Sequence, residues 1–237
     1  ILFMNKTLVA TATYNEINNI DKLIKKINNL KVKTDILVID DYSPDKTWLK
    51  LIKLKKKYKN LNYIIRKKKV GLDSAHKKIF SYALKKKYRY LITMDADLSH
   101  DPKIIPVFIK NIQNYDCVIG SRYIKGGKNG LKGFRLLLSK YGNILIRRVL
   151  NIDLHEFTTS YRCFDLKKLK KFHFNKVKVK GYSFFMYAIY LLKKFNYSIK
   201  EIPIIFHERS YGKSKIPKIE TFRTLLTLFL IKINYFD

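Results

Sequence analysis

The sequence predicts an α/β protein with a mostly parallel, doubly wound sheet flanked by helices. Three observations carry this prediction. Segments typical of strands and of helices alternate through residues 7–120. The strand-like segments are almost continuously apolar, as strands covered on both faces are. Polar and charged residues directly follow several of these segments. With 237 residues, 47% of them hydrophobic, the chain can bury the core that such a domain needs.

Five strands and four helices are expected in the first half. The strands cover residues 7–12, 35–40, 61–65, 90–94 and 117–120. Between them, apolar residues recur at helical spacing, which predicts helices at about 20–30, 44–58, 71–87 and 102–112. We place Pro44 in the first turn of the second helix. Asp101, directly before Pro102, is the expected cap of the fourth helix.

The second half is less regular. Three glycines between residues 126 and 130 mark a flexible loop. A strand is expected at 199–206, and Pro203 assigns it to the sheet edge. Helices are expected at 131–150, 184–192 and 221–235. The last helix has an apolar stripe among basic residues, and two positions stay open for this amphipathic helix: packed on the domain, or lying in a membrane interface. Since the sequence has no internal repeat and no linker, we expect one domain over residues 1–237.

The chain carries a formal net charge of +32, with 50 Lys and Arg against 18 Asp and Glu. Two explanations stay open: a compositional bias toward lysine, and an anionic partner such as nucleic acid, a membrane surface or a phosphorylated substrate. Nine of these 50 basic residues are arginines, whose planar fork suits phosphate. Six of the 13 aspartates fall within residues 40–45 and 95–101. A basic nucleic-acid-binding protein would leave these two windows unexplained.

Polar residues gather at the predicted carboxyl ends of the strands, where open α/β sheets bind their ligands. They are Asn15 and Glu16 after the first strand, Asp40 and Asp41 after the second, Asp95 and Asp97 after the fourth, and Arg122 after the fifth. Asp95 and Asp97 are spaced so that both can reach one hard cation, which prefers oxygen ligands. For Asp40, a helix-capping role remains an alternative to ligand binding.

Six motifs follow one another over residues 7–216. They are Ala12-Thr13-Tyr14-Asn15-Glu16; Val38-Ile39-Asp40-Asp41-Tyr42-Ser43-Pro44-Asp45-Lys46-Thr47; Gly71-Leu72; Met94-Asp95-Ala96-Asp97-Leu98-Ser99-His100; Gly120-Ser121-Arg122-Tyr123; and Arg209-Ser210-Tyr211-Gly212-Lys213-Ser214-Lys215. In this order and spacing the chain resembles the family 2 glycosyltransferases of the GT-A fold. Among these it resembles the polyprenyl-phosphate (dolichyl-phosphate) mannosyltransferases.

The resemblance implies an inverting transfer of a hexose, typically mannose from GDP-mannose or another nucleotide-sugar. It assigns residues 7–125 to the nucleotide-sugar and 126–216 to the acceptor, with the terminal helix at 217–237. The implied nucleotide-sugar-binding residues are Ala12, Tyr14, Glu16, Asp41, Asp95, Asp97 and Arg209. Asp95 and Asp97, with Ser99 as a weaker third ligand, would hold Mg²⁺ or Mn²⁺. Asp97, Arg122 and Arg209 are the implied catalytic residues.

The implied acceptor is a polyprenyl phosphate, dolichyl or undecaprenyl, held by Arg122, Arg135 and Ser139, with Arg162 as a further arginine near a phosphate. A phosphate monoester is already largely ionised near neutral pH, so it needs no strong general base. At position 187 many relatives carry Glu, which could act as a base, and this chain has Tyr187. The replacement therefore favours a phosphate acceptor over a hydroxyl acceptor. Glu156 and Ser160 depart from the usual Asp-x-Thr-Ser-Gly-Phe-Arg run. The main alternative is a family 2 enzyme that glycosylates a saccharide hydroxyl.

The resemblance also implies contact with a membrane surface, with a small membrane-anchoring subunit as an optional partner and without nucleic acid. We expect a cytoplasmic protein, peripheral on the cytosolic face of the ER membrane or of a bacterial inner membrane. No charged-then-apolar signal peptide opens the sequence. The apolar run at 225–231 is far shorter than the about 20 residues of a spanning helix. Two cysteines without metal-ligand spacing fit a reducing compartment.

Overall fold

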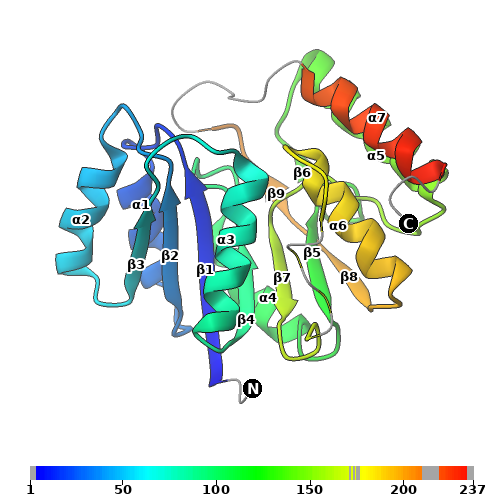
Figure 1. Cartoon of the computed structure of the whole chain (residues 1–237). Coiled ribbons are helices and arrows are strands. Elements are labelled where there is room, and N and C mark those ends of the chain that lie inside the picture. Colours follow the sequence, from blue (N-terminus) through cyan, green and yellow to red (C-terminus); the bar gives the residue numbers. More distant parts are fainter. Residues whose placement is uncertain (1–3, 171, 173, 175–176, 210–218, 234–237) are drawn as a thin grey trace.

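The computed structural model describes residues 4–170, 172, 174, 177–209 and 219–233, and a mixed sheet forms its centre (Figure 1). Among these residues, seven strands lie in the order β3-β2-β1-β4-β7-β5-β8. The strands are β1 (Met4–Thr13), β2 (Asp35–Asp40), β3 (Leu61–Ile65), β4 (Tyr88–Thr93), β5 (Cys117–Ser121), β7 (Arg162–Asp165) and β8 (Ile199–Pro203). Neighbouring strands are parallel except at β7, which runs antiparallel between β4 and β5. A separate parallel pair joins β6 (Lys128–Asn129) to β9 (Ile205–Phe206).

Helices cover both faces of the sheet. They are α1 (Ile20–Asn28), α2 (Thr47–Lys57), α3 (Leu72–Lys85), α4 (Ile105–Asn111), α5 (Gly133–Leu150), α6 (Ser183–Lys194) and α7 (Ile219–Lys232). Alternate side chains of β1 show the two layers: Leu8 packs into the core with α3 and α6, and Val9 packs into the core with α1, α2 and α4. In Figure 1, α5 and α7 lie together at the end of the molecule away from α2. This arrangement confirms the predicted α/β fold.

Most expected elements are confirmed, with three errors. The strand expected at 199–206 divides into β8 of the main sheet and β9, which pairs with β6 from the predicted loop. The second helix begins at Thr47 and not at Pro44, because residues 43–46 form a turn in which the Lys46 N–H donates to the Ser43 carbonyl. Strand β7 was not expected. Its four residues are all buried, but its first and last residues are the charged Arg162 and Asp165. The sequence therefore lacks the continuous apolar run by which buried strands are recognised. Asp101 caps a 3₁₀ turn (Pro102–Ile104) through the Lys103 N–H, as predicted.

The terminal helix is present as α7, but its predicted amphipathic character is not confirmed. Leu228 and Ile231 are buried against the protein, while Phe222 and Phe229 on the same helix are exposed. Large apolar side chains therefore occur on both its packed and its open side. The expected end of the helix, residues 234–235, lies outside the described residues.

Candidate functional site

The carboxyl ends of β2, β1 and β4 lie side by side, and the polar residues that end or follow these strands form what we call the strand-end cluster. Its members are Thr13, Asn15, Glu16, Asp40, Asp41, Asp95 and Asp97. Asp40 is completely buried and accepts hydrogen bonds from the Thr13 hydroxyl (2.8 Å), the Ser43 hydroxyl (2.6 Å) and the Ser43 N–H (2.9 Å). Asp40 therefore holds the turn before α2 and is not placed to bind a ligand.

The loops after β1 and β2 are joined to each other. The Glu16 N–H donates to the Thr47 hydroxyl, and the Ile17 N–H donates to Asp45, each over 3.0 Å. Glu16 is buried and accepts from the Asn19 amide over 2.7 Å. Tyr14 is half-buried, with the Lys69 ammonium 4.3 Å from its ring centroid. Ala12, half-buried, packs against the core on the α3 side.

Asp41 is held in place by Arg66, which sequence reasoning missed. The Arg66 Nε forms an ion pair with Asp41, and its two terminal nitrogens donate to the Ser74 hydroxyl (2.8 Å) and the Gly71 carbonyl (3.1 Å). The Val70 N–H donates to the other oxygen of Asp41 over 3.2 Å. Arg66 thus connects Asp41 to the start of α3. The scarcity of arginine was the signal that could have singled it out.

Asp97, which follows β4, is a buried carboxylate of the strand-end cluster. One of its oxygens accepts from the Ser99 N–H (3.1 Å) and hydroxyl (2.5 Å), and the other lies 2.9 Å from the Arg209 Nε. The structure therefore brings Asp97 and Arg209 together across 112 positions of the sequence. Of the motif at 209–215, only Arg209 lies within the described residues.

Asp95 is more open than Asp97, with 38% of its side chain exposed. It accepts from the Ser160 hydroxyl over 2.6 Å. The buried His100 Nδ1 accepts from the Asp95 N–H over 3.0 Å, so His100 supports the loop through a hydrogen bond. Burial lowers the pKa of His100, which keeps its ring neutral despite the nearby aspartates.

The carboxylates of Asp95 and Asp97 suit Mg²⁺ or Mn²⁺. Within the described residues, no group of three or more His, Cys, Asp or Glu side chains could hold a metal ion together. A two-carboxylate set still fits, because Mg²⁺ is commonly held by one or two carboxylates, with waters and substrate phosphates completing its shell. Ser99 is completely buried and gives its hydroxyl hydrogen to Asp97. Ser99 thus supports the carboxylate from within the protein.

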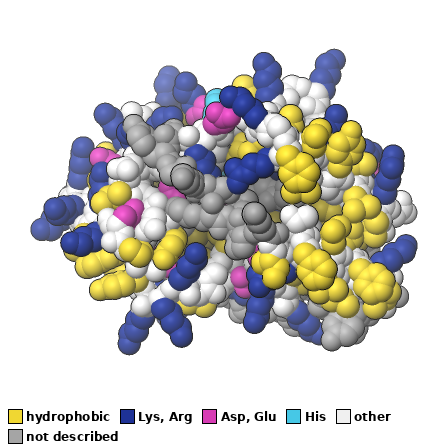
Figure 2. All heavy atoms as spheres, turned by 90° about the horizontal axis from the view of Figure 1, so that it is seen from above, with side chains coloured by type: hydrophobic (Ala, Val, Ile, Leu, Met, Phe, Trp, Pro, Cys, Tyr) yellow, Lys and Arg dark blue, Asp and Glu magenta, His cyan; other side chains and the backbone are white. Residues whose placement is uncertain are grey.

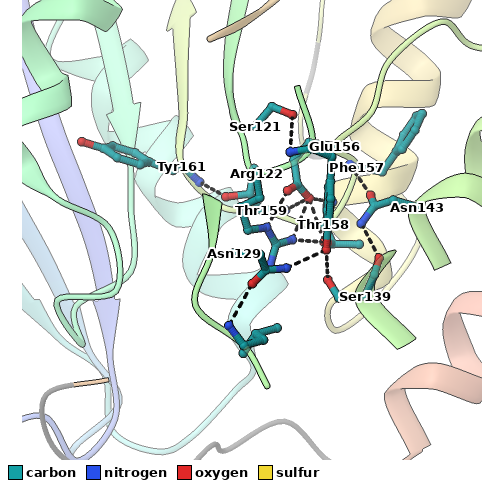
Figure 3. Close-up of polar contacts among 12 residues, drawn as sticks. Ser121, Arg122, Asn129, Ser139, Asn143, Glu156, Phe157, Thr158, Thr159 and Tyr161 are labelled. Carbon is teal, nitrogen blue, oxygen red and sulfur yellow. Dashed lines mark hydrogen bonds and ion pairs between the residues drawn. The ribbon is translucent and has the colours of Figure 1, made fainter. Parts of the chain in front are cut away.

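A second group of polar side chains, the Arg122 cluster, lies between the end of β5, the segment before β7, and α5 (Figure 3). Its members are Arg122, Tyr123, Asn129, Ser139, Asn143, Glu156 and Thr158. Arg122 donates to both oxygens of Glu156, from Nε over 2.6 Å and from Nη2 over 2.9 Å. Burial would raise the pKa of Glu156, but the charge and hydrogen bonds of Arg122 outweigh it and lower that pKa.

The expected acceptor residues have different surroundings. Ser139 on α5 accepts from the Tyr123 hydroxyl over 2.6 Å, so it belongs to the same network as Arg122. Arg135 is exposed, one helical turn before Ser139. The expectation that Arg162 lies near a phosphate is wrong. Its guanidinium is completely buried and donates to the carbonyls of Phe157 (2.8 Å) and Phe185 (2.9 Å), which makes it an internal brace.

Tyr187 within α6 and Tyr182 directly before this helix have different surroundings. Tyr187 is buried in the core beside α3, so the position where relatives carry Glu does not face the site. Tyr182 was missed. Burial raises the pKa of its phenol, Asp95 raises it further, and Arg209 counteracts this effect.

Comparisons with known proteins find similar sequences and similar folds. Residues 8–172 match the model of the family "Glycosyl transferase family 2". The chain is 33% identical over 214 residues to polyprenol monophosphomannose synthase of Mycolicibacterium smegmatis, covering 89% of this chain and 81% of that protein. It is 31% identical over 212 residues to undecaprenyl-phosphate mannosyltransferase of Micrococcus luteus, covering 89% and 87%.

Solved structures share the fold. One is glucosyl-3-phosphoglycerate synthase from Mycobacterium tuberculosis with Mn²⁺, UDP and glucosyl-3-phosphoglycerate, with a TM-score of 0.68 at 13% identity over 97% of this chain and 80% of that one. Another is a mannosyltransferase from Pyrobaculum calidifontis with GDP-Man and Mn²⁺, with a TM-score of 0.59 at 13% identity over 97% and 70%. On the family match and the similarity of sequence along most of its length, this chain belongs to glycosyl transferase family 2.

Proposed function

We propose that this protein transfers mannose, with inversion, from GDP-mannose to a polyprenyl phosphate. The names of the two relatives support this choice of sugar and acceptor. The observation in the molecule that carries it is a large exposed apolar surface on α5, the same helix that contributes Ser139 to the Arg122 cluster. An acceptor with a lipid tail and a phosphate head requires an apolar surface and an anion site side by side.

The apolar surface, which we call the α5–α7 surface, is formed by twelve exposed side chains. They are Phe134, Leu137, Leu138, Tyr141, Ile144 and Leu145 from α5, and Ile219, Phe222, Leu225, Leu226, Phe229 and Ile233 from α7 and the residue that follows it. Figure 2 shows hydrophobic side chains gathered on one side of the upper face, with Lys and Arg around them. Apolar side chains within a basic rim suit a membrane that contains anionic lipids.

We place the protein on the cytosolic face of a membrane through this surface. In the part of the chain that the structure describes, no helix is both long and apolar enough to cross a bilayer. The exposed fractions of Phe134 (77%), Phe222 (64%) and Phe229 (59%) are large for phenylalanine, so burying them in lipid would release considerable free energy. The same apolar surface would also suit a small membrane-anchoring subunit.

In this proposal, the strand-end cluster binds the donor. Tyr14, Glu16 and Asp41 would contact the nucleoside, with Ala12 lining the site. Asp95 and Asp97 would hold Mg²⁺ or Mn²⁺, which when bound neutralises charge on the departing diphosphate. Arg209 supplies a further positive charge at Asp97.

The acceptor phosphate would lie against Arg122, Ser139 and Arg135. Its oxygen is already anionic near neutral pH, so it attacks the sugar without a protein base. Positioning and charge stabilisation are then the main contributions of the protein. Position 187 agrees with this, because it holds a buried tyrosine and therefore supplies no carboxylate base.

The test is one transfer assay. Purified protein with Mg²⁺ or Mn²⁺ is given a panel of labelled GDP- and UDP-sugars together with dolichyl or undecaprenyl phosphate, and label is counted in the lipid extract. We expect lipid-linked label with GDP-mannose. Absence of lipid product with every donor would refute the proposal and favour a saccharide hydroxyl as the acceptor.

A further inference from the structure

Arg122 is held by its partner in an unusually complete way. Its side chain is 7% exposed and that of Glu156 is completely buried. Besides the two bonds from Arg122, Glu156 accepts from the Thr158 N–H (3.0 Å), the Thr158 hydroxyl (2.9 Å) and the Thr159 N–H (3.2 Å). The Arg122 Nη2 also donates to the Thr158 hydroxyl over 2.8 Å. Hydrogen bonds from Thr158 and Thr159 therefore hold the Glu156 carboxylate in place independently of Arg122.

The pair uses only part of the guanidinium. Nε and Nη2 donate to Glu156, whereas no described residue accepts a hydrogen bond from Nη1. The rings of Tyr123 and Phe206 each lie with their centroids 5.2 Å from the guanidinium carbon. Because Nε and Nη2 are already used by Glu156 and Thr158, Nη1 is the nitrogen of the guanidinium that remains to donate to a bound anion.

A chain of hydrogen bonds connects this pair to α5. The Tyr123 hydroxyl donates to Ser139, and the Asn129 amide donates to the Tyr123 hydroxyl over 2.9 Å. Asn143, one turn along α5, donates to the Ser139 carbonyl (2.8 Å) and accepts from the Phe157 N–H (2.7 Å), next to Glu156. In Figure 3, Ser139 and Asn143 of α5 lie to the right of Arg122. The helix with the exposed apolar surface is thus tied directly to the segment that holds Arg122.

We propose that Glu156 is a positioning residue of the acceptor site: it binds Nε and Nη2 of Arg122 so that Nη1 is presented to the phosphate of the lipid acceptor. This inference rests on the proposed function, because it takes Arg122 as a phosphate-binding residue. It goes further in assigning a role to Glu156, which the sequence marked only as a departure from the family pattern. Glu156 itself does not touch the substrate.

The test measures binding and transfer separately. Farnesyl phosphate, a short polyprenyl phosphate, is titrated into the full chain by calorimetry, which gives a dissociation constant and a binding stoichiometry. The variants are Glu156→Gln, Arg122→Gln and the double variant. The double variant replaces a buried ion pair by a neutral pair, which proteins often tolerate, so it remains informative where Glu156→Gln alone unfolds. Glu201→Gln is the matched control, because Glu201 is a nearly buried carboxylate that binds His155 and lies outside the Arg122 cluster.

We expect Glu156→Gln to weaken farnesyl phosphate binding by about tenfold or more, as for loss of one charged hydrogen bond. Affinity for GDP-mannose should stay unchanged. In the Arg122→Gln background, adding Glu156→Gln should change the dissociation constant by less than about twofold, because Glu156 acts through Arg122. Glu201→Gln should bind like the wild type.

Several results would overturn the inference. One is a wild-type protein that does not bind farnesyl phosphate, and another is an Arg122→Gln variant that binds it normally. A further one is a Glu156→Gln variant with fewer binding sites at an unchanged dissociation constant, since this would show a merely structural role. An equal loss from Glu156→Gln with and without Arg122 would also contradict it. Binding as expected without transfer to lipid would refute the proposed function and leave the role of Glu156 intact.

Discussion

The strand-end cluster and the Arg122 cluster are built in different ways. The strand-end cluster lies where three neighbouring parallel strands end, and its hydrogen bonds lie within short loops or join the loop after β1 to the loop after β2. The Arg122 cluster instead joins residues 34 apart beside an antiparallel strand, next to a helix with a wide apolar face. A site at strand ends follows from the order of the elements. A site made from a buried ion pair and a helix surface depends on how distant parts of the chain pack.

The largest effect is expected in the strand-end cluster. Asp97→Asn should lower the rate of lipid product formation by at least about a hundredfold, because it removes the carboxylate charge that Arg209 and the proposed metal share. The measurement is the initial rate with labelled GDP-mannose, with circular dichroism to check the fold. Asp101→Asn, which alters a helix cap close by, is the control and should retain its activity. Full activity in Asp97→Asn would remove the basis for a donor site here.

The next effect addresses the α5–α7 surface. The double variant Phe134→Ser, Phe229→Ser should reduce binding to anionic vesicles by about a hundredfold, since each exposed ring would contribute roughly 1.5 kcal/mol or more when buried in lipid. Binding is measured by vesicle co-sedimentation. Transfer to a water-soluble acceptor should persist, because neither ring belongs to a polar cluster. Leu49→Ser removes an exposed apolar residue of α2 and serves as the control. Equal vesicle binding by all variants would place the membrane contact elsewhere.

A third effect concerns the contact between the two halves. His76 on α3 is buried against Phe184 and Phe185 of α6, with its ring centroid 4.8 Å from that of Phe185. Burial, followed by the charge of Arg162, lowers the pKa of His76 to about 3. The unfolded chain takes up this proton near pH 6.5, whereas the folded protein does not until about pH 3, so stability falls as the pH is lowered through this window.

Between pH 7 and pH 5 this histidine should cost the wild type about 2 kcal/mol of unfolding free energy. In His76→Met that part of the loss should disappear, as measured by urea unfolding at both pH values. His207→Gln, which removes an exposed histidine, should lose as much as the wild type. The same loss in His76→Met as in the wild type would show that the contact between α3 and α6 is looser than described.

The smallest effect sharpens the role of Arg66. Arg66→Lys should raise the KM for GDP-mannose by about five- to tenfold, because a lysine cannot bind Asp41, Ser74 and Gly71 at once. The KM for the lipid acceptor should not change. Arg89→Lys is a matched control, since Arg89 also pairs with an aspartate, Asp165, but outside both clusters. An equal rise in KM for Arg66→Lys and Arg89→Lys would mean that Arg66 does not act through Asp41.

Much of the strand-end cluster could be predicted because its signals are local. A run such as 35–40 is apolar enough to identify a buried strand, and the acids that follow must then lie at the ligand-binding edge. Asp40 shows the limit of this argument. Its position was predicted correctly, yet its hydrogen bonds to Thr13 and Ser43 decide that it supports a turn.

The sequence by itself determined the α/β class, the order of most elements and the edge at which Asp41, Asp95 and Asp97 lie. Their spacing and the apolar periodicity are properties of short segments. Only the tertiary structure decided that Arg162 is an internal brace, that Glu156 binds Arg122, and that α5 and α7 leave many of their apolar side chains exposed. The physical reason is that burial and ion pairing depend on which distant segments meet. Strand β7, which joins β4 to β5, has too short and too mixed a sequence to be recognised alone.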